Sequence, residues 1–415
     1  MLGRRLLMSA GGWGSYSPPA PTPSVFALAA SPVGIGSTAT DPRAFTYNGV
    51  VYLAAVNSTT GYVMAWSYDI ATATASAPVA VGAAGSADVH SGPSVIVRSS
   101  DHRIVVAWSA HDAANFQIAV STNPEDASAF GAASNKTISG ASNDYTYMSM
   151  VQLNGEANDP IYLFWRDYNG TYGRIAYSTS TDGGSTWAAV TLLVTADGDA
   201  GQVVYWRVGT DWDTRIDILT TDSDRHDDSP SSVYHLWYEG GDWHQSDGTV
   251  ISTAKPFTAD QGTLVHDGGD GSCQVAGVAW DGAAPAGVFM IYKSVGPTNE
   301  VWSARYRSGA WQTDFVADTN GLMGGNRYHG GPAMTRTDPD TVFSAIKVGA
   351  KFEIVEITSP DDGATWIDAQ RTTASGSDAM DVETPAHAVA GLRVFWSRGT
   401  FTSDSSFLVG TEGLA

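Results

Sequence analysis

The chain has 415 residues, 43% of them apolar and 16% charged, so it can bury a large core and has room for two or three average domains or one long all-β domain. Its formal net charge of -21 argues against nucleic acid or an anionic membrane as the partner, because both require a basic surface. The single cysteine, Cys273, excludes an internal disulfide framework and a cysteine-based zinc site, and we expect it to be a small buried residue.

The first two dozen residues differ from the rest. Basic residues at the start precede an apolar run that is too short for a good signal peptide, and no stretch reaches the roughly 20 apolar residues of a membrane span. The proline-rich residues 17–23 predict an extended linker. We therefore expect residues 1–23 to be a flexible tail and residues 24–415 to be a single domain. Such a tail fits an extracellular, virion or cell-surface protein tethered to something larger.

Two histidines flank a predicted hairpin. Residues 94–97 and 104–108 are rich in β-branched and aromatic side chains, and the polar residues 99–102 between them predict a turn. If the two strands pair antiparallel, His90 and His111 lie at one edge of the sheet, where two titratable rings could begin a site. The alternative is that one or both histidines only hydrogen-bond a loop.

Similar units of strand, polar turn and strand follow one another from residue 24 to the end. Each has about four strand signals over roughly 45 to 55 residues, which is typical of a β-propeller blade. Counting predicts an all-β, seven-bladed β-propeller, with a fifth unit at residues 263–311 and a seventh at residues 385–410. No helical period is apparent.

Residues 180–187 and 359–366 share the pattern Ser-x-Asp-x-Gly-x-Thr-Trp, which resembles the Asp-box of sialidase-like propellers. In this motif the aspartate accepts turn amides, the glycine adopts a backbone angle that other residues avoid, and the tryptophan packs between sheets. We therefore expect Asp182 and Asp361 to be turn residues and not catalytic groups.

The chain resembles the BNR-repeat propellers that include the ulvan lyases, which cleave a uronate-containing algal polysaccharide. The resemblance covers most of residues 45–410. It is carried by motifs that occur in order: Asp88-x-His90-x-x-Pro93, His111, Tyr145-Thr-Tyr147, Tyr162-Leu-Phe-Trp-Arg166, Tyr234-His-Leu-Trp-Tyr238 with Asp247-Gly-Thr249, Gly330-Gly-Pro332, Asp338-Pro-Asp-Thr-Val342 and Arg393-Val-Phe-Trp-Ser-Arg398. It implies a polysaccharide lyase that acts on an anionic polysaccharide by β-elimination.

β-Elimination requires a group that neutralises the uronate carboxylate, a base for the neighbouring proton and an acid for the leaving oxygen. Arg166 suits the first task, because a guanidinium stays charged and grips a carboxylate through two hydrogen bonds. Tyr147 suits the second if a nearby arginine and imidazole lower its pKa from about 10. The alternatives are a surface salt bridge for Arg166 and a packing role for Tyr147, with Tyr145 as the other candidate base.

The resemblance implies that a tyrosine and a histidine share the base and acid roles beside a neutralising arginine. These roles fall on Tyr147, His90 and Arg166, and His111 would position the carboxylate or the second ring. Four further residues are expected to contact the sugar: Tyr145, Arg207, Tyr234 and His329.

We expect no cofactor for catalysis. A structural calcium or zinc ion could bind acidic turns at residues 222–224 or 338–340, although turn capping explains the same carboxylates. The expected partner is an anionic polysaccharide, bound by a monomer.

Two other functions compete. A sialidase-like glycoside hydrolase would need a different arginine set or paired carboxylates, and the sequence indicates no carboxylate pair beside the histidine, tyrosine and arginine candidates. A non-catalytic carbohydrate-binding propeller, such as a tail adhesin, would keep aromatic side chains but would not need His90, Tyr147 and Arg166 to converge.

Overall fold

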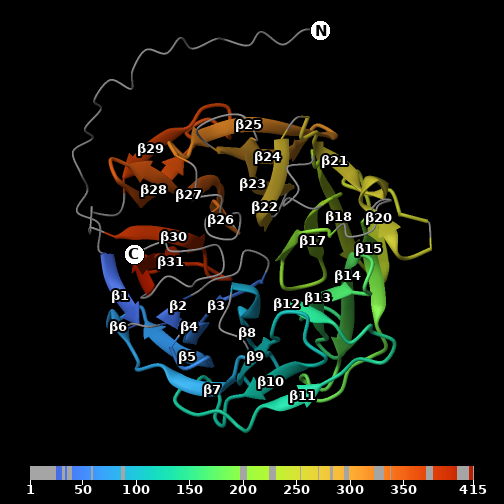
Figure 1. The fold of residues 1–415 in the computed structure, drawn as a ribbon, viewed down its shortest axis with the longest axis vertical. Helices are drawn as coiled ribbons and strands as arrows, with labels where there is room; N and C mark the ends of the chain where they lie inside the picture. Colours follow the sequence, from blue (N-terminus) through green and yellow to red (C-terminus); the bar gives the residue numbers. More distant parts are fainter. Residues whose placement is uncertain are drawn as a thin grey trace.

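The computed structural model is an all-β propeller in which seven sheets are arranged in a ring (Figure 1). It describes residues 25–29, 33–34, 40–57, 59–85, 89–196, 203–223, 230–252, 254–269, 271–280, 284–293, 299–321, 331–336, 338–370, 377–399 and 411–414. The predicted tail, residues 1–23, lies outside these ranges. Within them, no helix is long and apolar enough to cross a membrane.

The first half of the chain forms three of the sheets. One contains β2 (Val33–Gly34), β3 (Ala44–Tyr47), β4 (Val50–Asn57), β5 (Tyr62–Asp69), β6 (Thr74–Ala75) and β7 (Val79–Ala83). The next contains β8 (Ser94–Val97), β9 (Ile104–Trp108), β10 (Phe116–Val120) and β11 (Ser134–Lys136). The third contains β12 (Tyr145–Gln152), β13 (Ile161–Tyr168), β14 (Gly173–Ser180), β15 (Thr191–Thr195) and β20 (Phe257–Thr258).

Four sheets complete the ring. The fourth contains β16 (Trp206–Thr210), β17 (Ile216–Thr221), β18 (Val233–Glu239), β19 (Asp242–His244) and β21 (Thr263–His266). The fifth contains β22 (Gly271–Trp280), β23 (Pro285–Lys293), β24 (Glu300–Arg307) and β25 (Ala310–Asp318). The sixth contains β26 (Ala333–Thr335), β27 (Asp338–Val348), β28 (Lys351–Thr358) and β29 (Ile367–Gln370). The last sheet combines β30 (Asp378–Glu383), β31 (Val394–Gly399) and β32 (Thr411–Leu414) with β1 (Val25–Ala29). Short 3-10 turns occur at η1 (Val89–Ser91) and η3 (Ala259–Gln261).

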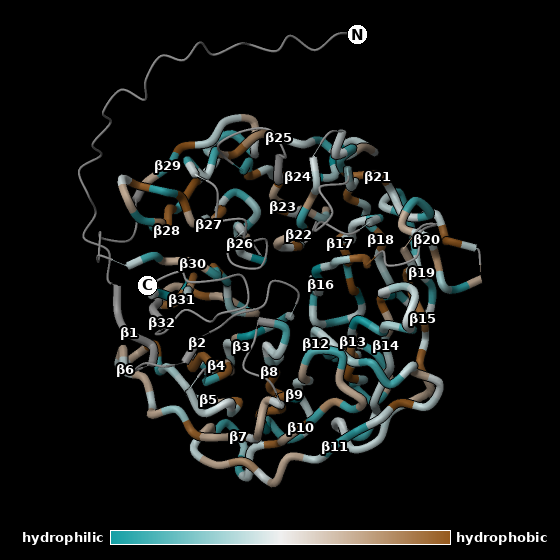
Figure 2. The backbone as a smooth tube through the Cα atoms, in the orientation of Figure 1, coloured by the Kyte–Doolittle hydropathy of each residue, from teal (hydrophilic) through white to brown (hydrophobic). Residues whose placement is uncertain are grey.

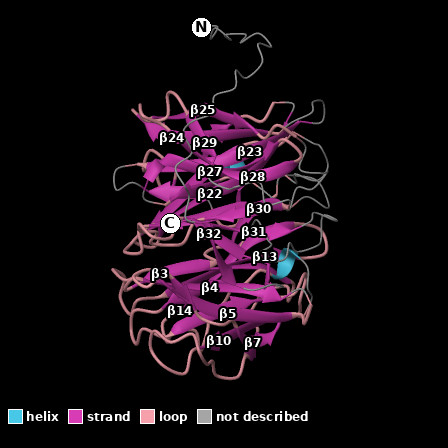
Figure 3. Ribbon diagram, turned by 90° about the vertical axis from the view of Figure 1, so that its left-hand side faces the viewer, coloured by secondary structure: helices cyan, strands magenta, loops and turns pink. Residues whose placement is uncertain are grey.

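The ring is closed by strands from both ends of the chain. β1 pairs antiparallel with β32, with Val25 opposite Leu414, and β32 continues to β31 and β30. A backbone bridge between Phe45 and Ala386 then joins this sheet to the first one. Seen from the side, loops form both faces of the resulting disc (Figure 3).

The sequence units and the sheets differ at two places. Thr263–His266 was expected to open the fifth unit, but it pairs with β18 and completes the fourth sheet. The last sheet begins at β30, ahead of the predicted unit at residues 385–410. Both predictions were wrong because the assignment of a short strand to one sheet or its neighbour depends on pairing across loops, which local composition does not encode.

Strands packed between neighbouring sheets are apolar on both faces. Every residue of β8 and β9 is buried, and six tryptophans are fully buried: Trp66, Trp108, Trp165, Trp206, Trp243 and Trp396. Figure 2 shows hydrophobic residues recurring along the strands around the whole ring. Such continuous short apolar runs are what strands covered on two sides require. The buried Cys273 belongs to this core, as expected.

The two segments with the shared aspartate pattern form matching turns. Asp182 accepts hydrogen bonds from the backbone N–H (2.8 Å) and hydroxyl (2.6 Å) of Thr186, and Asp361 accepts the same pair from Thr365 at 2.7 and 2.8 Å. Burial raises the pKa of Asp182, but these hydrogen bonds outweigh it and lower the pKa to about 2. Trp187 packs edge-on against Phe116 of the neighbouring sheet. Both carboxylates therefore stabilise turns.

Charges from four sheets meet in a central ion cluster of the buried residues Asp41, Arg43, Arg207 and Glu383 and the half-buried Arg336. The Arg207 guanidinium lies 3.1 Å from the Asp41 carboxylate and 2.9 Å from that of Glu383, which also pairs with Arg43. Arg336 reaches Asp41 at 3.0 Å. Arg207 belongs to the fourth sheet and binds carboxylates from the first and last sheets, so the cluster connects parts of the ring that are not neighbours.

Candidate functional site

The histidine pair lies where the hairpin register places it. Ser94 pairs with Ala107, and His90 and His111 each lie four residues beyond this pair, so both emerge at one end of the hairpin. Their rings are stacked, with centroids 3.8 Å apart and planes 2° from parallel. His90 is buried, whereas the His111 side chain is 38% exposed. The pair therefore has one inner and one outer ring.

Tyr147 and Arg166 are brought to the same place by the neighbouring β12–β13 hairpin, and β12 contacts both β8 and β9. Thr146 pairs with Arg166, and the register then shifts before Ser149. Tyr147 sits in this bulge with φ of 61°, a left-handed conformation that turns its side chain out of the regular alternation. Its ring lies 5.5 Å from that of His90 and 5.1 Å from the Arg166 guanidinium carbon.

Asp112 joins the two hairpins. Its carboxylate accepts a hydrogen bond from Arg166 Nη2 at 2.7 Å and lies 3.4 Å from His111 Nε2. Thr146 accepts the Asp112 backbone N–H at 2.8 Å and donates its hydroxyl to the same carboxylate at 3.1 Å. An isolated bridge between Ala113 and Tyr145 holds this loop against β12. The resulting cluster of His90, His111, Asp112, Tyr147 and Arg166 is called the His–Tyr–Arg site below.

The charges in the site stabilise one another. Burial lowers the pKa of Arg166, but the rings of Tyr147 and Tyr205 and the Asp112 carboxylate outweigh burial and hold this pKa above its usual value. Burial raises the pKa of Asp112, and the charge and hydrogen bond of Arg166 together with the His111 ring reverse this effect and lower it. Arg166 therefore stays cationic and Asp112 anionic across the neutral pH range.

Asp144 carries the opposite perturbation. Burial and the nearby Asp112 carboxylate raise the pKa of Asp144 to about 7, although the charge of Arg166 opposes them. The site therefore contains two carboxyl groups with different proton affinities, one ionised and one that holds its proton close to neutrality. Such a pair can divide acid and base tasks.

Two of the other predicted contacts, Tyr145 and Arg207, have their printed partners outside this cluster. Tyr145 is fully buried, packs on Phe116 and Trp165, and its hydroxyl accepts the Ile138 N–H at 2.7 Å. Arg207 belongs to the central ion cluster. Tyr234 lies on β18, where burial and neighbouring carboxylates raise its pKa. His329 lies outside the described residues.

Sequence reasoning missed Asp112, Asp144 and Tyr205. Tyr205 lies just before β16, with its ring 6.1 Å from that of Tyr147. Asp112 and Asp144 could have been found as the residues that follow His111 and precede Tyr145, because an acidic neighbour of a candidate site residue is a candidate partner. Tyr205 had no such local signal, since it comes from a different sheet.

Among the described residues, no group of three or more histidine, cysteine or acidic side chains is arranged to hold a metal ion, and Asp224 of the expected sites lies outside them. Asp338 accepts the Asp340 N–H at 3.1 Å and the Thr341 hydroxyl at 2.8 Å, and Asp340 pairs with Arg305. Asp222 accepts the Ser232 N–H at 2.9 Å. Asp338 therefore caps a turn, Asp340 pairs with a cation, and Asp222 holds a backbone amide across its loop.

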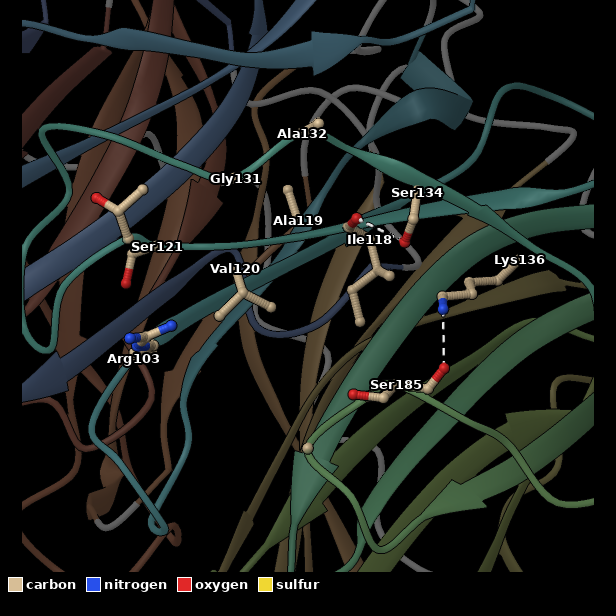
Figure 4. A pocket seen from close by; sticks show the side chains of 13 residues that line it. Arg103, Ile118, Ala119, Val120, Ser121, Gly131, Ala132, Ser134, Lys136 and Ser185 are labelled. Atoms are coloured by element: carbon tan, nitrogen blue, oxygen red, sulfur yellow. Dashed lines mark hydrogen bonds between the residues drawn. The ribbon is translucent and has the colours of Figure 1, made fainter.

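A cavity of about 420 Å³ lies away from the His–Tyr–Arg site, between β10 and the turn at residues 183–185 (Figure 4). Arg103 lies at one end and Lys136 at the other, with Ile118 between them. Lys136 donates to the Ser185 carbonyl at 2.8 Å, and Arg103 lies 3.5 Å from the Asp101 carboxylate. Both cations are thus engaged by the protein itself.

Comparison with solved structures shows the same fold in polysaccharide lyases. An ulvan lyase of family PL25, solved with -[GlcA(1-4)Rha3S]- bound, has a TM-score of 0.74 and 16% identity over 93% of this chain and 94% of its own. The polysaccharide lyase Uly1 has a TM-score of 0.59 and 11% identity over 93% and 90%. No curated protein matches the chain. Residues 50–319 match the family described as BNR repeat-containing family member, and since this is more than half of the chain, the chain belongs to that family.

Proposed function

We propose that this chain is a polysaccharide lyase that cleaves a uronate-containing, ulvan-like anionic polysaccharide by β-elimination. The observation that carries the proposal is the convergence of His90, His111, Tyr147 and Arg166, from two neighbouring sheets, into one cluster. The fold shared with ulvan lyases supports it, at an identity too low to transfer a reaction by itself. Each of the seven sheets would be one blade, with Asp-box turns at residues 180–187 and 359–366.

In the proposed reaction Arg166 binds the uronate carboxylate and stabilises the negative charge that develops there. A base, either Tyr147 as phenolate or a neutral imidazole, takes the proton from the carbon next to the carboxylate. The electron pair of that bond forms a carbon–carbon double bond as the bond to the neighbouring glycosidic oxygen breaks. The leaving oxygen takes a proton from an acid, which is the member of the tyrosine–histidine pair that does not act as the base. Each cleavage therefore forms one new double bond and one new sugar end.

The test is incubation of the full chain with ulvan and with other uronate polymers while ultraviolet absorbance of the new conjugated double bond is followed. We expect absorbance to rise in step with new reducing ends. Tyr147→Phe should reduce the rate by at least about 100-fold, because the hydroxyl that exchanges the proton is lost. Tyr145→Phe is the matched control and should remain active. A fully active Tyr147→Phe enzyme would contradict the assignment of this tyrosine.

A glycoside hydrolase is the second candidate, and Asp112 and Asp144 favour it. The sequence indicated no carboxylate pair beside the histidines, yet these two groups lie there with their pKa values pushed in opposite directions. A hydrolase would use such a pair as base and acid if the two carboxyl groups were held about 5 Å or more apart. Reducing ends without the ultraviolet signal would identify hydrolysis, whereas polymer binding without either product would identify a carbohydrate-binding protein such as an adhesin.

The location of the protein follows from the proposed substrate, and its assembly is a separate proposal. A polysaccharide substrate is met outside the cell, so we propose an extracellular, virion or cell-surface protein. We also propose that it acts as a monomer. A structural calcium or zinc ion remains a proposal, tested by metal analysis of the purified full chain.

A further inference from the structure

We infer that the cavity between β10 and the turn at residues 183–185 is a second binding site of this chain, which holds a segment of an anionic polysaccharide at a distance from the His–Tyr–Arg site. The presence of a site for a polyanion stands on the geometry and charge of the cavity. The choice of a polysaccharide as that polyanion rests on the proposed function.

The charge of the cavity is opposite to that of the chain as a whole. The sequence has 43 acidic and 22 basic residues, yet the described residues that line the cavity include Arg103 and Lys136 and no acidic one. A cavity of about 350 Å³ on the other side of the same turn provides a contrast, because Asp159 and Asp182 line it beside Arg98. An anionic ligand is therefore favoured in the first cavity and disfavoured in the second.

Both cations keep charge for a ligand. Lys136 donates to the carbonyl of Ser185, which is neutral, so this hydrogen bond holds the ammonium in place without cancelling its charge. The Arg103 side chain is 41% exposed and lies 3.5 Å from the Asp101 carboxylate, which also accepts two shorter hydrogen bonds from Arg98. The contact with Arg103 is thus a weak surface pair, and a ligand carboxylate or sulfate can bind the same guanidinium.

The spacing of the two cations indicates an extended ligand. Lys136 pairs with Phe116, and the carbonyl of Ile104, the neighbour of Arg103, accepts the N–H of Ser121. The five residues of β10 separate these two pairs, which is roughly 17 Å at about 3.4 Å per residue. Figure 4 shows the two side chains at opposite ends of the cavity. A ligand that contacts both is therefore a chain with more than one negative group.

The lining of the cavity suits sugars. Ile118 lies between the cations, and Gly184 lets the turn pack against it, since a Cβ there would lie 2.7 Å from Ile118 Cδ1. The hydroxyls of Thr122, Ser134 and Ser185 line the same space and can bond sugar hydroxyls. The described lining residues include no aromatic side chain, so the base stacking that binds single-stranded nucleic acid is not provided.

The second site lies apart from the proposed catalytic cluster. Arg103 lies at the turn of the β8–β9 hairpin and His111 lies beyond its open end, so the five residues of β9 put at least roughly 17 Å between them. A polymer held at one site meets the other at a raised effective concentration. The second site should therefore favour long chains over short ones.

The experiment is a calorimetric titration of the full chain with a sulfated galactan oligosaccharide, which carries negative groups but no uronate, so that β-elimination cannot consume it. We expect Arg103→Gln/Lys136→Gln to weaken binding about tenfold, because each exposed ion pair contributes modestly. Binding to the wild-type chain should also weaken as salt is added. If the double variant does not fold, the two single variants replace it, each with an expected loss of about threefold.

The chain offers a matched control in Arg307→Gln/Lys351→Gln. These side chains are 30% and 31% exposed, each pairs with a carboxylate, and they lie on the fifth and sixth sheets. The control variant loses the same charge and should bind the probe as the wild-type chain does. The inference is overturned if the Arg103/Lys136 variant binds within about twofold of the wild-type chain, or if the control loses as much affinity.

Two further probes test the kind of ligand. Desulfated galactan should not bind measurably, and binding equal to that of the sulfated form would overturn the role of the cations. Poly-glutamate should bind more weakly than the sulfated galactan, since it lacks the sugar hydroxyls, and equal or tighter binding would overturn the assignment to a polysaccharide.

Catalysis gives an independent readout. If the wild-type chain is a lyase, Arg103→Gln/Lys136→Gln should raise the ratio of KM on a long uronate polymer to KM on a short oligosaccharide. An unchanged ratio would overturn the contribution of the second site to substrate binding. If the chain has no lyase activity, the proposed function fails, and the titration with sulfated galactan still decides whether the cavity binds a polyanion.

Discussion

Removing one carboxylate from the central ion cluster should destabilise the whole ring. The Glu383 side chain is 6% exposed, and one of its oxygens accepts from both Arg43 and Arg207. Glu383→Gln would leave these two guanidinium groups without that charge in the interior, where burial and the charge of Arg207 already lower the pKa of Arg43 to about 9. Loss of one partner of a buried ion pair costs about 3 to 5 kcal/mol. We expect a decrease of this size in the free energy of unfolding.

The assay is urea denaturation followed by tryptophan fluorescence. The midpoints report differences in stability if the variant and the wild-type chain have the same m-value, the slope of unfolding free energy against urea concentration. Glu239→Gln is the control, because this exposed carboxylate accepts a hydroxyl from Thr214 at 3.2 Å and should matter by less than about 0.5 kcal/mol. A Glu383→Gln variant within about 1 kcal/mol of the wild-type chain would refute the idea that the cluster holds the sheets together.

Three other changes test the site and the fold. Arg166→Lys should lower the rate of polymer cleavage by about 100-fold, since an ammonium cannot hold a carboxylate through two parallel hydrogen bonds, and a rate equal to wild type would exclude Arg166 from carboxylate binding. Asp144 has a pKa raised to about 7 in the folded state, so its contribution to stability is present below about pH 4 and lost as the pH rises through 7; Asp144→Asn should flatten this part of a plot of melting temperature against pH. Gly184→Ala should cost about 2 kcal/mol, because φ is 92° and a Cβ would lie 2.7 Å from Ile118 Cδ1, whereas Gly240→Ala, with φ of 62° and open space, should cost about 1 kcal/mol in the same urea titration.

Local patterns predicted the strands well. The predicted residues 94–97 and 104–108 coincide with β8 and β9, because β-branched runs bounded by polar turns carry their own signal. The histidines could be placed at one end of this hairpin for the same reason, since strand register follows from the turn between them.

The remaining features depend on tertiary contacts. Both tyrosine rings are buried, and a bulge in β12 brings the Tyr147 ring, which the regular alternation would put on the same face as Tyr145, to 5.5 Å from the His90 ring. The local residue pattern does not predict this bulge. Asp112 is recognised as part of the site only in the folded structure, where Arg166 of the next sheet hydrogen-bonds its carboxylate. Side chains that act together across sheets are therefore the part of a propeller site that a single sequence reveals least.

The pairing of β1 with β32 has a consequence for how the protein is made. β1 is synthesised long before its partner β32, so the last sheet cannot form until Leu414 has been made. Until then, the exposed edge of the unfinished ring is open to pairing with other chains. Deletion of β32 (Thr411–Leu414) should therefore yield an open, association-prone ring in place of a slightly shorter version of the closed one.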